Sequence, residues 1–80
     1  MKKIKLTTRD VQPAWRGLLR IARKAAINHP LPQTGNWMTN AEFILLNHPI
    51  APKGGWIERG KNHVALFLGN RCLGKIEAIG

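Results

Sequence analysis

The chain has 80 residues, enough for one hydrophobic core, so we expect a single domain over residues 1–80. It carries 13 Lys and Arg residues against 4 Asp and Glu, a formal net charge of +9, and 44% of its residues are hydrophobic. The hydrophobic content argues against disorder, and the length excludes a multi-domain mechanism. A core this small usually leaves only about 3–5 kcal/mol of stability, so burial of further surface against a partner, or in a homodimer, would not be surprising.

The cysteine content and the apolar runs indicate a cytoplasmic protein. Cys72 is the only cysteine, so no disulfide forms within the chain and a reducing compartment fits best. Polar residues from Thr7 to Asp10 follow the basic start, where a signal peptide would have an apolar segment, so we expect no export signal. The longest apolar runs are far shorter than the ~20 residues that cross a bilayer, and we expect a soluble protein.

The first third of the chain predicts a strand followed by a helix. Residues 3–6 alternate polar and apolar side chains, as in a strand with one buried face. A helix is predicted over residues 14–26, with Pro13 in its first turn and Asp10 as its cap. Asn28-His29-Pro30 is expected to end it. The expected apolar arc of this helix consists of Ala14, Trp15, Leu18, Leu19, Ile21, Ala22, Ala25 and Ala26.

The remaining residues predict a second helix and three strands. After a loop over residues 30–38, Thr39 and Glu42 are expected to form a capping box, and Asn47-His48-Pro49 to end the helix. Beyond a loop at residues 50–55, turn signals at 59–62 and 69–70 predict antiparallel strands over 56–58, 63–68 and 72–79. Gly74 indicates a bulge or the close approach of another backbone.

These elements predict an α+β fold in the order β-α-α-β-β-β. Two helices are expected to pack on an antiparallel sheet of three to four strands. The element order, size and charge resemble the RelE/ParE-type toxins, whose members cleave messenger RNA on the ribosome or poison gyrase. That resemblance implies a ribonuclease or translation inhibitor, although the family's His/Tyr catalytic set cannot be placed here because the chain has no tyrosine. A winged-helix fold is a further alternative, but it would need a third helix.

The positive charge is concentrated at the start of the chain, where residues 1–25 have a net charge of +7. On the predicted helix, four cations fall at i, i+4, i+7 and i+8, a line that can follow a phosphate backbone. No acidic residue interrupts this line, whereas a face that served solubility alone would mix both signs. The four are Arg16, Arg20, Arg23 and Lys24.

Further cations flank this predicted helix or lie at the turns between strands. The additional candidates for binding nucleic acid or an acidic protein surface are Lys3, Lys5, Arg9, Arg59, Lys61 and Arg71. Basic residues at a projecting turn can grip a groove as a wing does, but hairpin turns are as often basic for solubility alone.

Metal binding and catalysis have little support. Three histidines and one cysteine have zinc-ligand chemistry, namely His29, His48, His63 and Cys72. No two of them share one element at ligand spacing, so we predict no metal and no cofactor. No nucleophile or phosphate-binding motif occurs, and we expect a non-enzymatic protein. The enzymatic alternative is a phosphodiester-cleaving site in which His63 acts with Arg59, Lys61 and Arg71.

A short sequence recurs at an offset of 19 residues. Asn28-His29-Pro30-Leu31, with Gly35 and Trp37 after it, returns as Asn47-His48-Pro49-Ile50 with Gly54 and Trp56. We interpret both stretches as helix stops followed by similar loops; the alternative is a duplicated unit whose loops form one binding edge. The tryptophans are expected in the core, namely Trp15, Trp37 and Trp56; the alternative for Trp37 and Trp56 is a role as surface anchors.

The leading hypothesis is a small basic protein that docks its Arg-rich helix face and strand lysines on nucleic acid or a nucleoprotein without catalysis. The alternative is a protein-protein inhibitor or adaptor of a larger nucleic-acid-processing enzyme, of the kind that mobile elements encode. In that case the basic face would meet an acidic surface. No base-reading motif favours DNA over RNA.

Overall fold

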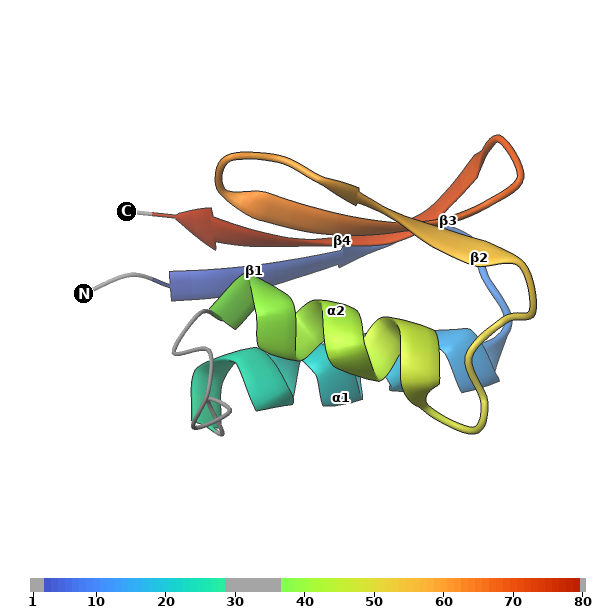
Figure 1. Ribbon diagram of the computed structural model, residues 1–80, viewed down its shortest axis with the longest axis horizontal. Helices are drawn as coiled ribbons and strands as arrows, with labels where there is room; N and C mark the ends of the chain where they lie inside the picture. The colour runs from blue at the N-terminus through green and yellow to red at the C-terminus, as the bar shows by residue number, and fades with distance from the viewer. Residues whose placement is uncertain (1–2, 29–36, 80) are drawn as a thin grey trace.

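A computed structural model describes residues 3–28 and 37–79, in which two helices cover one face of a four-stranded antiparallel sheet (Figure 1). The elements are β1 (Lys3–Thr8), α1 (Pro13–Asn28), α2 (Trp37–Asn47), β2 (Gly55–Arg59), β3 (His63–Leu68) and β4 (Arg71–Ile79). The predicted α+β class and the order β-α-α-β-β-β are confirmed. Neither helix in the described part of the chain is long and apolar enough to span a bilayer.

The sheet has the strand order β1-β4-β3-β2, so the first strand of the chain pairs with the last. Leu6 on β1 and Val64 on β3 both lie opposite Ile76 on β4. Strands β1 and β2 form the two edges of the sheet. Because side chains alternate along a strand, Ile4 and Leu6 pack against the core, whereas Lys3 and Lys5 face away from the helices.

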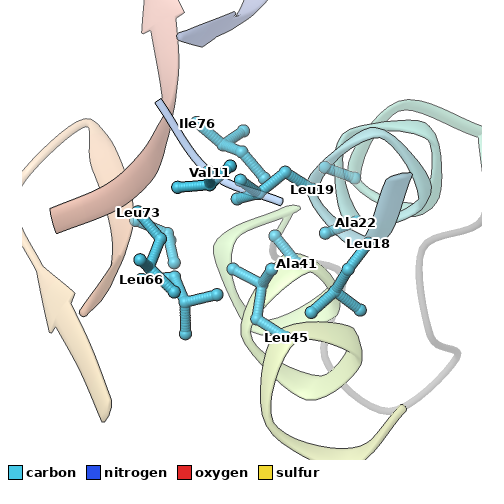
Figure 2. Close-up of a cluster of buried hydrophobic side chains, with 11 residues drawn as sticks. Val11, Leu18, Leu19, Ala22, Ala41, Leu45, Leu66, Leu73 and Ile76 are labelled. Carbon is cyan, nitrogen blue, oxygen red and sulfur yellow. The ribbon is translucent and has the colours of Figure 1, made fainter. Parts of the chain in front are cut away.

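The core lies between the two helices and the covered face of the sheet (Figure 2). Its largest completely buried apolar side chains are Leu18, Leu19, Leu45, Leu66, Leu73, Ile76 and Val64. Ala22 on α1 and Ala41 on α2 are also completely buried, and their small side chains allow the helices to approach each other. Trp15 packs against this cluster, as expected.

Gly74 marks the place where α1 comes closest to the sheet. A Cβ atom there would lie 2.5 Å from Cδ1 of Leu19 and 3.1 Å from the carbonyl oxygen of Thr7. The pairing of β3 with β4 shifts register between Leu66 and Phe67, which leaves Leu73 as the extra residue of a β-bulge. Gly74 therefore adjoins a bulge and also meets another backbone, as its sequence position indicated.

The start of α1 differs from the expectation. The residue before the helix is Gln12, whose carbonyl oxygen accepts hydrogen bonds from the N–H groups of Trp15 and Arg16, both at 3.1 Å. The expected cap, Asp10, lies two residues further upstream and the expectation was wrong. Pro13 is the first residue of the helix, a position where its missing N–H costs nothing.

The predicted start of α2 was also wrong. The helix begins at Trp37, so Thr39 and Glu42 lie within it and do not form a capping box at its start. Trp37 and Met38 pack against the core, and this packing extends the helix upstream of the capping pattern that Thr39 and Glu42 suggested. It ends at Asn47, as predicted. Strand β3 has its predicted bounds, β2 is one residue longer at each end, β4 begins one residue earlier, and β1 runs two residues further than predicted. The first of the two Asn-His-Pro loops, and the predicted loop as far as residue 36, lie outside the described residues.

The apolar arc of α1 is narrower than expected. Ile21 is 42% exposed and Ala14 is exposed as well. The helix contacts α2 on one side and the β1–β4 pair on the other, and only the arc between these two contacts is buried.

The close approach at Gly74 is testable by substitution. Gly74→Ala should lower the free energy of unfolding by about 1–3 kcal/mol, because the added methyl group meets Leu19 and Thr7 in a filled core. Gly17→Ala in α1 is the matched control: its methyl group would meet nothing within 4 Å. Since alanine favours the helix more than glycine does, the free energy of unfolding of this variant should rise by up to about 1 kcal/mol. Urea unfolding, followed by circular dichroism, measures the free energy of unfolding of both variants. Equal changes in the two variants would contradict the close packing at Gly74.

Candidate nucleic-acid interface

A groove runs between α1 and the edge strand β1. Its lining residues are Lys3, Ile4, Lys5, Leu6, Arg20, Arg23, Ile27 and Ile79. Four of these side chains are cationic, two from each element, and none of the lining residues is acidic. Ile27 and Ile79, which are 46% and 43% exposed, add apolar surface beside the cations. The groove therefore offers positive charge and apolar contact together.

Arg23 is fixed against the outer edge of β1. Its Nε atom donates a hydrogen bond to the carbonyl oxygen of Ile4 at 2.7 Å. Among the described strands, β1 pairs with β4 alone, and the guanidinium satisfies an acceptor on β1 from outside the sheet. Because the acceptor is neutral, the charge of Arg23 is not cancelled. Its terminal nitrogens have no hydrogen-bond partner among the described residues.

Arg20 and Lys24 project from the exposed side of α1, one helical turn apart. Arg20 lines the groove, whereas Lys24 is not among the lining residues. Six of the predicted binding residues have side chains without a hydrogen bond or ion pair to another described residue: Lys3, Lys5, Arg9, Arg20, Lys24 and Lys61. Their charges are available to an external anion.

Arg16 departs from the predicted line of cations. It is half-buried, and its Nη2 atom donates a hydrogen bond to the carbonyl oxygen of Val11 at 3.1 Å. The guanidinium is thus engaged with the segment that precedes α1. The cations of α1 that face solvent are therefore Arg20, Arg23 and Lys24.

The two arginines at the strand turns have structural partners. Nη2 of Arg71 donates to the carbonyl oxygen of Asp10, which joins the start of β4 to the segment between β1 and α1. Arg59 bonds to α2, with Nη1 3.3 Å from a carboxylate oxygen of Glu42 and Nη2 3.4 Å from the hydroxyl oxygen of Thr39. The residues expected to cap α2 hold this arginine instead.

The turn residues do not form one cluster. Lys61 lies in the β2–β3 turn and Arg71 follows the β3–β4 turn, and these turns are at opposite ends of β3. The wing-like grip by Arg59, Lys61 and Arg71 is therefore not assembled. His63 lies at the Lys61 end, with Nε2 3.2 Å from Oε1 of Glu58. The predicted set of His63 with Arg71 for phosphodiester cleavage is likewise not brought together.

The candidate metal ligands are dispersed. Within residues 3–28 and 37–79, no three His, Cys, Asp or Glu side chains lie together as a metal site. Nδ1 of His48 accepts a hydrogen bond from the N–H of Ile50 at 3.2 Å, which stabilises the turn after α2. Cys72 is a half-buried free thiol. His29 lies outside the described residues.

The two candidate tryptophan anchors differ. Trp37 lies in α2 and packs against the core, as expected. Trp56 lies on the edge strand β2 and is exposed, so the expected core position was wrong for it.

Comparisons of the chain with protein-family models, with curated proteins and with solved structures found no match.

Sequence reasoning identified the four cations of the groove but not the groove itself. It missed Ile27 and Ile79, which border the cations from the end of α1 and from β4. No local pattern marks them, because the pairing of β1 with β4 joins residues more than 60 positions apart.

The structural and the solvent-facing arginines should differ in stability tests. Arg71→Ala should lower the free energy of unfolding by about 0.5–1 kcal/mol, because the bond to the carbonyl of Asp10 is lost. Arg20→Ala removes no bond to another described residue and should change the free energy of unfolding by less than about 0.5 kcal/mol. Urea titrations of both variants measure the difference. A larger loss for Arg20→Ala than for Arg71→Ala would contradict the assigned roles.

Proposed function

We propose that this protein binds nucleic acid, without catalysis, through the groove between α1 and β1. The observation that carries the proposal is the gathering of Lys3, Lys5, Arg20 and Arg23 around one groove that no acidic side chain lines. A face that served only solubility would gain from mixed signs, as the pair of Arg59 with Glu42 does elsewhere.

Phosphate is the anion that this arrangement suits best. The cations extend along one side of α1 and along β1, so they can meet successive phosphates of a chain. The terminal nitrogens of Arg23 present two donors to one phosphate, while Lys3 and Lys5 act as point charges. The exposed Ile27 and Ile79 could contact a sugar or the edge of a base.

The chemistry of the chain is consistent with action in the cytoplasm. A single free cysteine suits a reducing compartment. A cytoplasmic protein with a net charge of +9 meets nucleic acid as the most abundant polyanion around it.

A salt titration tests the proposal. If the groove contacts three or four phosphates of duplex DNA, log K should fall against log salt concentration with a slope of about −3. Arg20→Ala should weaken binding and make the slope shallower by about 1. Lys53→Ala, an exposed cation outside the groove, is the matched control and should leave the slope unchanged. Fluorescence anisotropy with labelled duplex DNA and RNA measures these constants.

Two results would overturn the proposal. One is the absence of binding to DNA and RNA at low salt. The other is a partner protein that stays bound in stoichiometric amount after nuclease treatment, with release by Arg20→Glu; this would show that the groove serves an acidic protein surface.

A further inference from the structure

An aromatic pair, whose Trp56 is exposed, lies on the face of the sheet that turns away from the helices. Trp56 on β2 lies opposite Phe67 on β3, with the ring centroids 4.6 Å apart and the ring planes inclined by 20°. Nε1 of Trp56 donates a hydrogen bond to the carbonyl oxygen of Gly69 at 2.9 Å. The indole is thus held at two points, yet Trp56 is 45% exposed.

The fixed indole is a preformed surface for another flat ring. Its only polar group is already satisfied, so what it offers to a ligand is apolar, π-rich area. Because the ring is held by Phe67 and Gly69, little side-chain entropy remains to be lost on binding. No helix or strand within the described ranges covers this face, and both helices lie on the other side of the sheet (Figure 1).

One cation, Lys75, lies on the same face between the aromatic pair and the lysines of β1. Lys75 on β4 lies between Ala65 of β3 and Thr7 of β1 in the register of the sheet. With strands about 4.8 Å apart, Lys75 lies roughly 12 Å from Trp56 across the small Ala65, a distance that a short stretch of extended single strand spans. Beyond Lys75, at the edge of the sheet, come the two lysines of β1.

Lys3 and Lys5 connect this face with the proposed binding site. They alternate with the core-facing residues of β1, which places them on the face away from the helices, and they also line the groove. The two acidic residues on this face have basic partners: Glu58 lies 3.2 Å from His63, and Glu77 lies 3.8 Å from Lys75. The route from Trp56 to the groove therefore crosses the small Ala65 and the Lys75–Glu77 pair before it reaches the lysines of β1.

We infer that the ligand of the groove is a single-stranded nucleic acid, and that one of its unpaired bases stacks on Trp56. This inference rests on the proposed function and names its substrate class. A duplex offers phosphates to the groove, but its bases are already stacked and cannot reach the indole. A single strand presents both phosphates and free π-faces, as aromatic platforms on sheets require.

Binding of three polyanions to the full chain tests the inference. The probes are a single-stranded RNA of mixed sequence, a duplex of the same length, and inorganic polyphosphate, which has charge but no bases. Trp56→Leu should weaken binding of the single strand about tenfold and leave the affinities for duplex and polyphosphate unchanged. Trp56→Phe keeps an aromatic ring and should retain more of the single-strand affinity than the leucine variant.

Phe43→Leu is the matched control, because Phe43 is an exposed aromatic residue, 53% accessible, on the helical side of the molecule. It should not change the affinity for any of the three probes. Intrinsic fluorescence adds a direct readout: single-stranded RNA should quench tryptophan emission, polyphosphate should not, and the quenching should disappear in Trp56→Phe. Trp15 and Trp37 are half-buried against the core and should contribute little to it.

The outcomes separate the inference from the proposed function. Unchanged single-strand affinity in Trp56→Leu would overturn the stacking, while salt-dependent binding that is sensitive to Arg20→Ala would leave the groove as the nucleic-acid site. An equal loss of affinity for all three probes in Trp56→Leu would also overturn the stacking, since the substitution would then act by disturbing the fold. If the unaltered protein binds none of the three probes at low salt, both fail.

Discussion

The approach of α1 to the junction between β1 and β4 is the contact on which the arrangement of the molecule depends. Leu19 packs where Gly74 has no side chain, and the backbone of Thr7 lies at the same point. One helix is thus held against the first and the last strand together. Because of this contact, the basic side of α1 lies beside the free edge of β1, and a groove forms between two elements that carry cations.

A second feature is the way in which the arginines find partners in a chain with few carboxylates. Arg16, Arg23 and Arg71 each donate to a backbone carbonyl oxygen, and two of these carbonyls belong to the segment between β1 and α1. A neutral acceptor satisfies a donor and fixes the guanidinium without cancelling its charge. Arg59, which meets Glu42, is the contrasting case. These arginines can therefore support the fold while the surface stays strongly positive.

The two faces of the sheet have different roles in this arrangement. One face is closed by the helices and holds the leucine-rich core (Figure 2). The other carries lysines, a cross-strand aromatic pair and two acidic residues, of which Glu58 contacts His63 and Glu77 pairs with Lys75. Strand β1 belongs to both surfaces that we connect with nucleic acid, because its lysines border the groove and begin the open face. A ligand that used both would have to be flexible enough to turn around this edge.

Periodicity and turn chemistry, both local properties, were sufficient for the α+β class, the order of the elements, the end of α2 and the special position of Gly74. They failed at the start of α2, where packing against the core outweighs the capping pattern. The helix starts at Trp37, which packs against the core, and Thr39 and Glu42 bind Arg59 instead of capping the helix. Local patterns identified every cation of the groove, because charge is a property of each residue. They could not identify the groove, since only the long-range pairing of β1 with β4, and the packing of α1 over Gly74, brings those cations together.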